Sequence, residues 1–113
     1  MDECIFCRIV RGELKSNIVR DDEHCLVFHD QTPQAPLHLL AIPKKHISSM
    51  SDAEEEDRLL LGHLLFVCKD VADQLGHGSA FRLVVNNGRG AGQALFHLHV
   101  HLLAGRSLGW PPG

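Results

Sequence analysis

The sequence has no tyrosine, one tryptophan and no excess of basic residues. Lysine and arginine number 11 against 14 aspartates and glutamates, for a formal net charge of −3. The chain therefore lacks the basic field that holds a nucleic-acid backbone. No apolar run approaches the roughly 20 residues that cross a bilayer, and the acidic N-terminus resembles neither a secretory signal nor a transit peptide. We expect a cytoplasmic protein with no nucleic-acid or membrane partner.

The composition, 44% hydrophobic and 22% charged over 113 residues, suits one globular domain spanning residues 1–113. Short runs rich in apolar and β-branched residues, bounded by polar or turn-forming residues, predict strands. Their bounds are 18–20, 25–29, 37–42, 81–85 and 96–103. A short helical segment over 4–10 is stopped by Gly12.

A long helix is predicted over residues 52–75. Ser51 and Glu54 have the spacing of a capping box, and Gly76 is suited to end the helix. Apolar residues at steps of three and four form one stripe, which consists of Leu61, Leu64, Cys68, Val71 and Leu75. We therefore expect an α+β domain in which one long and one short helix pack on an antiparallel sheet of about five strands.

Histidine, a reactive residue type, is unusually frequent, with nine in the chain. His97, His99 and His101 alternate with Leu98 and Val100, so a strand would place the three imidazoles on one face, about 6.7 Å apart. An ordinary half-buried strand shows the same alternation. Two chemical interpretations compete with that one: three ligands of a zinc ion, or an imidazole nucleophile that its neighbours orient.

Residues 93–103, QALFHLHVHLL, match the motif His-φ-His-φ-His-φ-φ, with φ apolar, of the histidine triad (HIT) superfamily. The likeness covers almost the whole chain, and the further matching segments are 25–30, 33–36, 42–47, 85–86 and 105–113. Together these segments resemble the histidine triad nucleotide-binding (Hint) branch. The resemblance implies a HIT-like fold and a homodimer in which two sheets join, with the C-terminal segment reaching the partner's site.

The resemblance also implies a hydrolase of purine nucleoside 5′-phosphoramidates, with AMP- or GMP-type substrates. His99 matches the nucleophile that attacks the α-phosphorus and forms a nucleotidyl-histidine, which water then hydrolyses. His101 matches the residue that contacts the phosphate and helps to protonate the leaving group. The residue chemistry agrees, because a neutral imidazole is a competent nucleophile near pH 7.

The family's nucleotide-contacting positions have counterparts here. Gln93 and the backbone of the glycine-rich loop 88–92, Gly92 included, would hold phosphate oxygens. Asn86 would contact phosphate and ribose, and Asp30 matches the acceptor of the ribose hydroxyls. The other matched positions are Phe28, His29 and Gln31 at the base, and His38 as a buried histidine that supports the triad.

The sequence departs from the branch at Ala94, where a serine is usual. The serine hydroxyl contacts the leaving-group side of the phosphate, and an alanine side chain cannot donate that hydrogen bond. Losing a donor to the transferring group costs a few kcal/mol if nothing replaces it. Slower turnover or a different leaving-group preference is therefore expected.

Cys4 and Cys7 form a Cys-x-x-Cys pair, which suits a metal site or redox chemistry. The resemblance adds His46 and His97 as the other two ligands of a structural zinc ion. Four protein ligands leave no open coordination position, so His97 would be a ligand and the other two triad histidines would carry the chemistry. No organic cofactor is expected.

Three alternatives stay open. A dinucleoside polyphosphate hydrolase of the same superfamily is disfavoured by the ending Trp-Pro-Pro-Gly at 110–113. A zinc hydrolase with all three triad histidines as ligands would lose its turnover to a chelator. A nucleotide-binding regulator with vestigial catalysis, which Ala94 favours, would bind a nucleoside monophosphate and release nothing from a phosphoramidate.

Overall fold

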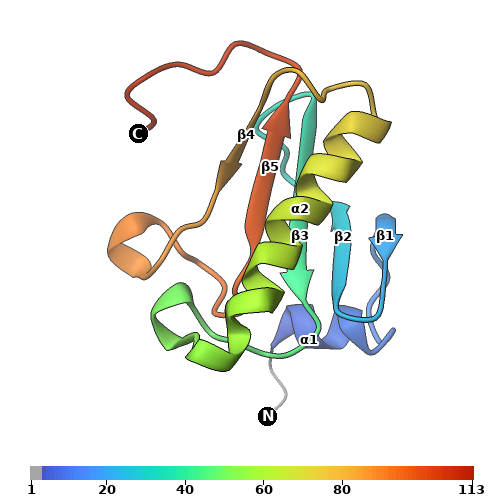
Figure 1. The fold of residues 1–113 in the computed structure, drawn as a ribbon, viewed down its shortest axis with the longest axis vertical. Coiled ribbons are helices and arrows are strands. Elements are labelled where there is room, and N and C mark those ends of the chain that lie inside the picture. Colours follow the sequence, from blue (N-terminus) through green and yellow to red (C-terminus); the bar gives the residue numbers. More distant parts are fainter. Residues whose placement is uncertain (1–3) are drawn as a thin grey trace.

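The computed structural model describes residues 4–113. Its strands form one antiparallel sheet with the strand order β1-β2-β3-β5-β4. The strands are β1 (Ile18–Asp21), β2 (Cys25–His29), β3 (Leu37–Pro43), β4 (Phe81–Val84) and β5 (Val100–Ala104). Helix α2 (Arg58–Gln74) crosses one face of the sheet, and the short helix α1 (Ile5–Val10) lies at one end (Figure 1). The predicted α+β architecture is confirmed. Within 4–113 no helix is long and apolar enough to span a membrane.

Each face of the sheet carries its own apolar core, because side chains alternate along the strands. The face under α2 has the larger core, which includes Val27, Leu39, Val100, Leu102, Leu64, Val67, Cys68 and Val71. The opposite face packs against α1 through Phe6, Leu26, Phe28, Leu40 and Ile42. His101 stands directly opposite Leu40 in the β3–β5 pairing. The smaller core is therefore the side of the sheet on which the triad lies.

The long helix begins later than the sequence predicted. Two 3₁₀ turns, at 50–52 and 55–57, precede α2, which begins at Arg58 and not at residue 52. Ser51 is not its cap: the Ser51 N–H donates to Asn87 Oδ1, and the Ser51 hydroxyl accepts from the Asn87 amide, both at 2.9 Å. The chain around Ser51 is tied to the loop after β4, so the helix starts beyond it.

The capping box is formed instead by Glu54 and Asp57. Asp57 is buried, and Lys45 Nζ lies 2.6 Å from its carboxylate, which holds the helix start beside the end of β3. At the other end Gly76, with a φ of +86°, follows the helix as predicted. Leu75 is 43% exposed and does not join the apolar stripe, because as the C-cap residue it has left helical geometry.

The last strand also begins later than predicted, at Val100. This residue pairs with Ala41, and β3 ends two positions further on at Pro43, which has no backbone N–H to extend a ladder. The N–H of Leu98 donates instead to the carbonyl of Ile47, at 2.7 Å. The segment that carries the first two triad histidines therefore lies outside the sheet, although Leu98 still projects into the core under α2.

Gly105 makes a close contact just after β5. Its φ is +97°, and a Cβ added there would lie 2.9 Å from the Cβ of Pro36. We expect Gly105→Ala to lower the free energy of unfolding by about 2 kcal/mol, because it combines a left-handed backbone with a steric clash. Urea unfolding measures the change. Gly109→Ala is the control, since a Cβ there meets nothing within 4 Å; equal midpoints for both variants would contradict the prediction.

A polar contact ties the β1–β2 hairpin to α2. Asp22 Oδ2 lies 2.8 Å from His63 Nε2, while Oδ1 accepts the backbone N–H groups of His24 and Cys25, both at 2.8 Å. Burial raises the pKa of Asp22, but the N–H of His24, the His63 imidazole and the N–H of Cys25 outweigh burial. The pKa is therefore held well below its ordinary value.

This contact makes the stability pH-dependent. A carboxylate with a depressed folded-state pKa stabilises fully above its unfolded pKa of about 4, and that stabilisation is lost as the pH falls through the folded pKa. We expect Asp22→Asn to cost about 1 kcal/mol at pH 7 and clearly less at pH 2. Thermal unfolding of both proteins at the two pH values measures this; a cost that is equal or larger at pH 2 would contradict it.

Candidate functional site

The structure brings the three triad histidines together, but they make different contacts. The ring of His99 lies between those of His101 and Phe6, at centroid distances of 5.0 and 5.3 Å. The ring of His97 contacts His46 at 4.9 Å and Phe6 at 5.8 Å. The three imidazoles are therefore not a regular row on one strand, because β5 begins only at Val100. His97 turns to the cysteine pair, and His101 turns to His38.

The backbone determines which nitrogen of His99 carries the proton. His99 is 8% exposed, and its Nδ1 lies 2.7 Å from the carbonyl oxygen of His97. Because a carbonyl only accepts, Nδ1 must be the donor, and in the neutral ring Nε2 has the lone pair. An imidazole with a free Nε2 lone pair is the form that can attack an electrophile.

A second hydrogen-bond chain orients His101. The backbone N–H of Gln34 donates to His38 Nδ1 at 3.0 Å, so the proton of neutral His38 is on Nε2. That N–H lies 2.9 Å from His101 Nδ1, which accepts it and leaves the proton of neutral His101 on its own Nε2. Adjacent imidazoles thus have complementary roles, because His99 offers a lone pair and His101 offers an N–H.

Burial lowers the pKa of His101 to about 4, and positive charge on His99 or His38 adds to this effect while Asp30 opposes it. Burial also lowers the pKa of His38, again against the carboxylate of Asp30. Both imidazoles are therefore neutral at pH 7. A phosphate bound beside them would raise both pKa values, because a nearby anion favours the protonated form.

Asp30 lies next to this histidine pair. Its Oδ1 accepts hydrogen bonds from the Thr32 N–H (2.8 Å) and hydroxyl (3.2 Å), and its Oδ2 is 3.4 Å from His38 Nε2. Thr32 therefore holds the carboxylate in one orientation. The carboxylate thus lies beside the His38–His101 pair, and its contact with ribose stays a prediction.

The residues predicted at the base lie along β2 and in the loop after it. Phe28 pairs with Leu40, which pairs with His101, so these three side chains form a row across β2, β3 and β5. His29 follows Phe28 in β2 and is exposed at the strand end, and Gln31 is exposed in the loop beyond. Neighbouring strand residues point to opposite faces, so Phe28 and His29 lie on opposite faces of the sheet. The contact of these residues with a base stays a prediction.

Gln93 braces the glycine-rich loop and is not free to hold a phosphate. It is 3% exposed; its Oε1 accepts from the Gly88 N–H at 2.9 Å, and its Nε2 donates to the carbonyls of Ser48 (2.8 Å) and Leu95 (3.0 Å). Both amide donors are used. The predicted phosphate contact is therefore corrected, because the buried side chain already has its partners inside the protein.

Backbone groups beside Gln93 are available for an anion. Within 4–113 the N–H of Ala94 makes no hydrogen bond. Gly92 has a φ of +99°, and the Asn86 amide is 3.8 Å from where its Cβ would be. Asn86 thus lies beside the loop, and its contact with phosphate and ribose stays a prediction. The Ala94 side chain contributes a methyl group with no donor.

The cysteine pair meets both predicted histidines. Cys4 and Cys7 lie on the first turn of α1, where the Cys7 N–H donates to Cys4 Sγ at 3.2 Å. His97 Nδ1 is 3.2 Å from Cys4 Sγ and 3.5 Å from Cys7 Sγ. His46 Nδ1 is 3.2 Å from both Cys7 Sγ and His97 Nδ1. All four donor atoms lie within 4.8 Å of one another.

This donor set fits a zinc ion. Tetrahedral zinc holds its ligand atoms roughly 3.3–3.8 Å apart, close to the separations found here. His97 Nε2 is 2.8 Å from the carbonyl of Pro43 and must carry the ring proton, so His97 Nδ1 has a lone pair for the ion. Burial and the neighbouring Cys4 raise the pKa of Cys7 to about 11, so metal binding would release thiol protons.

Three contributors to the site were not predicted. Phe6 packs against the rings of His97 and His99. Its position between the two cysteines of the predicted metal site could have indicated this contact. Gln34 and Pro43 act through a backbone N–H and a backbone carbonyl. Such groups are present in every residue, so the sequence carries no sign of them.

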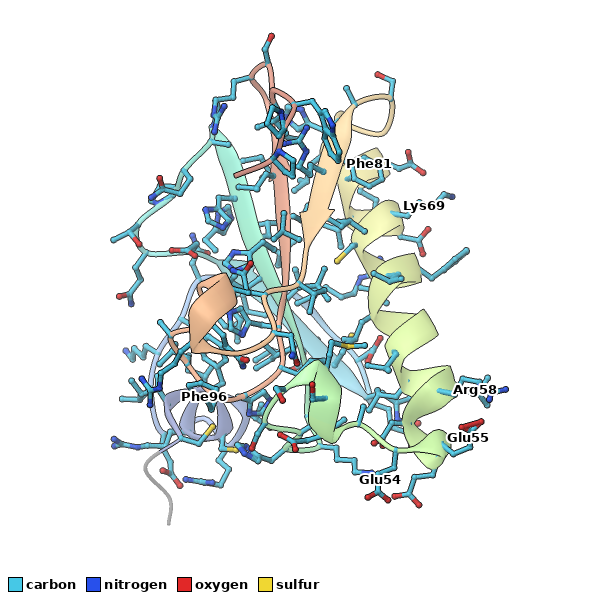
Figure 2. All side chains as sticks on the ribbon, turned by 90° about the vertical axis from the view of Figure 1, so that its left-hand side faces the viewer. Glu54, Glu55, Arg58, Lys69, Phe81 and Phe96 are labelled. Carbon is cyan, nitrogen blue, oxygen red and sulfur yellow. The ribbon has the colours of Figure 1, made fainter. Side chains whose placement is uncertain are left out.

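A cavity of about 290 Å³ lies beside His97. Its wall is mainly apolar and consists of Cys4, Ile5, Phe6, Ala94, Leu95, Phe96 and His97. Figure 2 labels Phe96, which stacks under the guanidinium of Arg89 at 5.2 Å. Neither His99 nor His101 lines this cavity, so it lies to the side of the reactive imidazoles.

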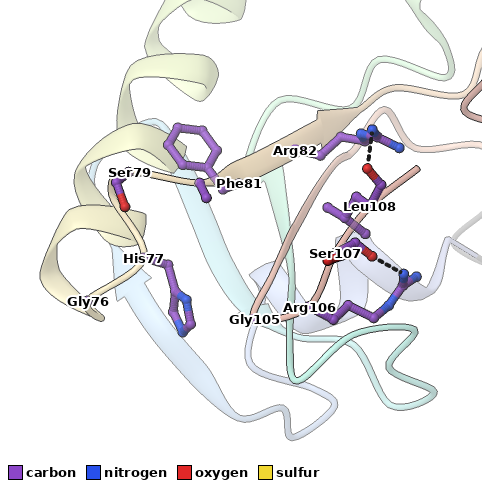
Figure 3. A pocket seen from close by; sticks show the side chains of 10 residues that line it. Gly76, His77, Ser79, Phe81, Arg82, Gly105, Arg106, Ser107 and Leu108 are labelled. Carbon is purple, nitrogen blue, oxygen red and sulfur yellow. Dashed lines mark hydrogen bonds between the residues drawn. The ribbon is translucent and has the colours of Figure 1, made fainter. Parts of the chain in front are cut away.

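A cavity of about 640 Å³ lies elsewhere, between the end of α2 and the segment after β5 (Figure 3). Arg82 and Arg106 line it, and both guanidinium groups donate to backbone carbonyls. No predicted site residue lines this cavity. We therefore place the site by its chemistry and not by cavity size.

The chain matches the HIT domain family model over residues 11–108. An uncharacterized HIT-like protein of Synechocystis is 53% identical, over 99% of this chain and 98% of that protein. A crystal structure of a HIT family hydrolase from Legionella pneumophila is 45% identical with a TM-score of 0.96, and the match covers 98% of this chain and 100% of that one. A histidine triad nucleotide-binding protein from Candida albicans is 30% identical with a TM-score of 0.82, over 96% and 83%. The chain belongs to the HIT family.

Proposed function

We propose that this protein hydrolyses purine nucleoside 5′-phosphoramidates through a nucleotidyl-His99 intermediate. The observation that carries the proposal is the hydrogen bond from His99 Nδ1 to the His97 carbonyl, which leaves the His99 Nε2 lone pair free beside the N–H of His101. The Legionella relative, described as a hydrolase, supports the reaction class. The Candida relative, described as nucleotide-binding, supports the ligand class.

In the first step His99 Nε2 forms a bond to phosphorus while the P–N bond breaks, and the leaving amine takes up one proton. Bound phosphate favours protonation of the His38–His101 pair, so His101 Nε2–H can deliver that proton. In the second step water attacks the phosphorus, a water proton passes to His101 and the bond to His99 breaks. The product is a nucleoside monophosphate.

Donor geometry argues against a zinc hydrolase built on the three triad histidines. Among residues 4–113, His97 groups with the cysteine pair, whereas His101 groups with His38 and Asp30. His99 Nδ1 is occupied by a backbone carbonyl. The three rings thus face three different partners. Ala94 keeps the nucleotide-binding regulator as the second candidate, because its side chain supplies no donor at the phosphate.

We further propose that Cys4, Cys7, His46 and His97 hold a structural zinc ion. The donor separations and the fixed tautomer of His97 support this. A fully ligated ion supplies no open position for substrate, so its contribution would be to tie α1 and the loop after β3 to the triad.

We also propose that the protein is a homodimer joined along β4 and α2. β4 is an edge strand, and the outer side of α2 exposes Leu59 (88%) and Phe66 (61%). Trp110 is 82% exposed on the tail after β5, which suits a role in the partner's site. Light scattering should give about twice the chain mass of 12.5 kDa; a monomer at micromolar concentration would contradict this.

Release of a fluorescent amine from an adenosine 5′-phosphoramidate tests the function. We expect release that survives a chelator. Quenching within one turnover by an alkaline denaturant, which preserves a P–N bond, should trap an adenylyl group on His99. Binding of AMP without release would favour the regulator. Loss of release to the chelator, with the fold intact, would favour catalytic zinc.

Restoring the hydroxyl tests the departure at Ala94. We expect Ala94→Ser to raise kcat roughly 10-fold, because the new donor can contact the transferring phosphoryl group. Steady-state amine release measures the change. Ala80→Ser places the same hydroxyl on an exposed residue in the turn before β4, outside the predicted site, and is the matched control. A kcat that does not rise in Ala94→Ser would contradict the prediction.

A further inference from the structure

One residue connects the cysteine pair with the nucleophile. The side chain of His97 faces Cys4 and Cys7 through Nδ1, while its carbonyl accepts the His99 Nδ1–H at 2.7 Å. His97 is 1% exposed, and its Nε2–H is held by the carbonyl of Pro43. A change in the position of His97 would therefore move the group that sets the tautomer and direction of His99.

Phe6 makes a second connection between the same two places. It lies between Cys4 and Cys7 in the chain and is 4% exposed. Its ring packs edge-on against His97 at 5.8 Å and 74°, and against His99 at 5.3 Å and 86°. Edge-to-face packing of this kind restricts where the rings can lie. The turn that carries both thiols therefore also forms one wall around the nucleophile.

The strand ladder does not hold His99 in place. β5 begins at Val100, so His99 precedes the paired residues. Its surroundings are the His97 carbonyl, the Phe6 ring and the His101 ring. The carbonyl belongs to His97, which is one of the four residues proposed to hold the metal ion. The Phe6 ring belongs to the turn between two others, Cys4 and Cys7. An attacking atom displaced by about 1 Å can cost about 10²-fold in rate.

We propose that the Cys4–Cys7 turn, when held by its metal ion, positions the nucleophile, with Phe6 and His97 as the positioning residues. The ion then affects the rate of the chemical step as well as the stability of the fold. The kinetic part of this proposal rests on the proposed function, whereas its structural part does not.

The test compares the metal-loaded wild type with Cys7→Ser at a temperature where both are folded. NMR of ¹⁵N-labelled histidines reads the tautomer of His99, and amine release gives kcat and KM. We expect His99 to lose its single Nδ1–H tautomer, kcat to fall about 10- to 100-fold and KM to change less than about 2-fold. Cys7→His, which keeps a ligand nitrogen, should restore both readouts. If Cys7→Ser is folded and free of metal, and its His99 signal and kcat equal those of the wild type, the proposal is wrong.

A second variant keeps the ligands and covers the case in which Cys7→Ser does not fold. We expect Phe6→Ala in the metal-loaded protein to mix the His99 tautomers and lower kcat with metal content unchanged. Arg8→Ala, partly exposed on the same helix, is the control. Phe6→Ala with an unchanged His99 signal also overturns the proposal. If the wild type itself releases no amine, the proposed function fails, and the NMR comparison still decides the positioning.

Discussion

His99→Ala should abolish phosphoramidate turnover while nucleotide binding persists. We expect kcat to fall by about 10⁴-fold or more, because the substitution removes the atom that forms the covalent intermediate. AMP affinity should change much less, since Asp30, Asn86 and the Ala94 N–H remain. Amine release measures the first effect, and calorimetric titration with AMP measures the second.

His24→Ala is the matched control for that prediction. It removes an imidazole whose side chain is 62% exposed in the β1–β2 turn and should keep the wild-type kcat. The adenylyl group that quenching traps on the wild type should be absent from His99→Ala. If His99→Ala retains a tenth or more of the wild-type kcat, water attacks the phosphorus directly and the covalent mechanism is wrong.

The strands and their buried faces could be predicted, because they follow from the local alternation of apolar and polar residues. The start of α2 and the start of β5 could not be predicted. The helix start depends on Ser51 pairing with Asn87, which lies 36 residues away. The start of β5 depends on Pro43 and on the bond between Leu98 and Ile47. Each boundary is determined by a partner distant in the sequence, and no local pattern records such a partner.

The site shows the same division. Cys4, Cys7, His46 and His97 lie together, as the family resemblance implied. The Cys-x-x-Cys spacing alone indicated only the cysteine pair. Gln93 differed, because its role depends on whether its amide is already hydrogen-bonded inside the protein. The tautomers likewise depend on backbone carbonyls and N–H groups, which become visible only once the chain is folded.

Removing the metal ion should lower the thermal stability strongly. An ion at about 10³ times its Kd stabilises the folded state by about 4 kcal/mol, and each kcal/mol shifts the Tm of a domain of this size by about 4 °C. We therefore expect chelation to lower Tm by about 15 °C. Differential scanning calorimetry measures the shift, with zinc content determined on the same samples. Cys4→Ser is the control, because a chelator should not lower its Tm further.

The loss should begin at α1. The ion would join the first turn of α1 to His46 and His97, whereas the larger core under α2 contains no ligand. Amide exchange in α1 should therefore accelerate on chelation, while exchange in β3 and β5 stays slow at low temperature. If purified protein contains no zinc and chelation leaves Tm unchanged, the zinc proposal fails. Cys4 and Cys7 would then be interpreted as the redox pair that their spacing also allows, and mild oxidation should join them in a disulfide.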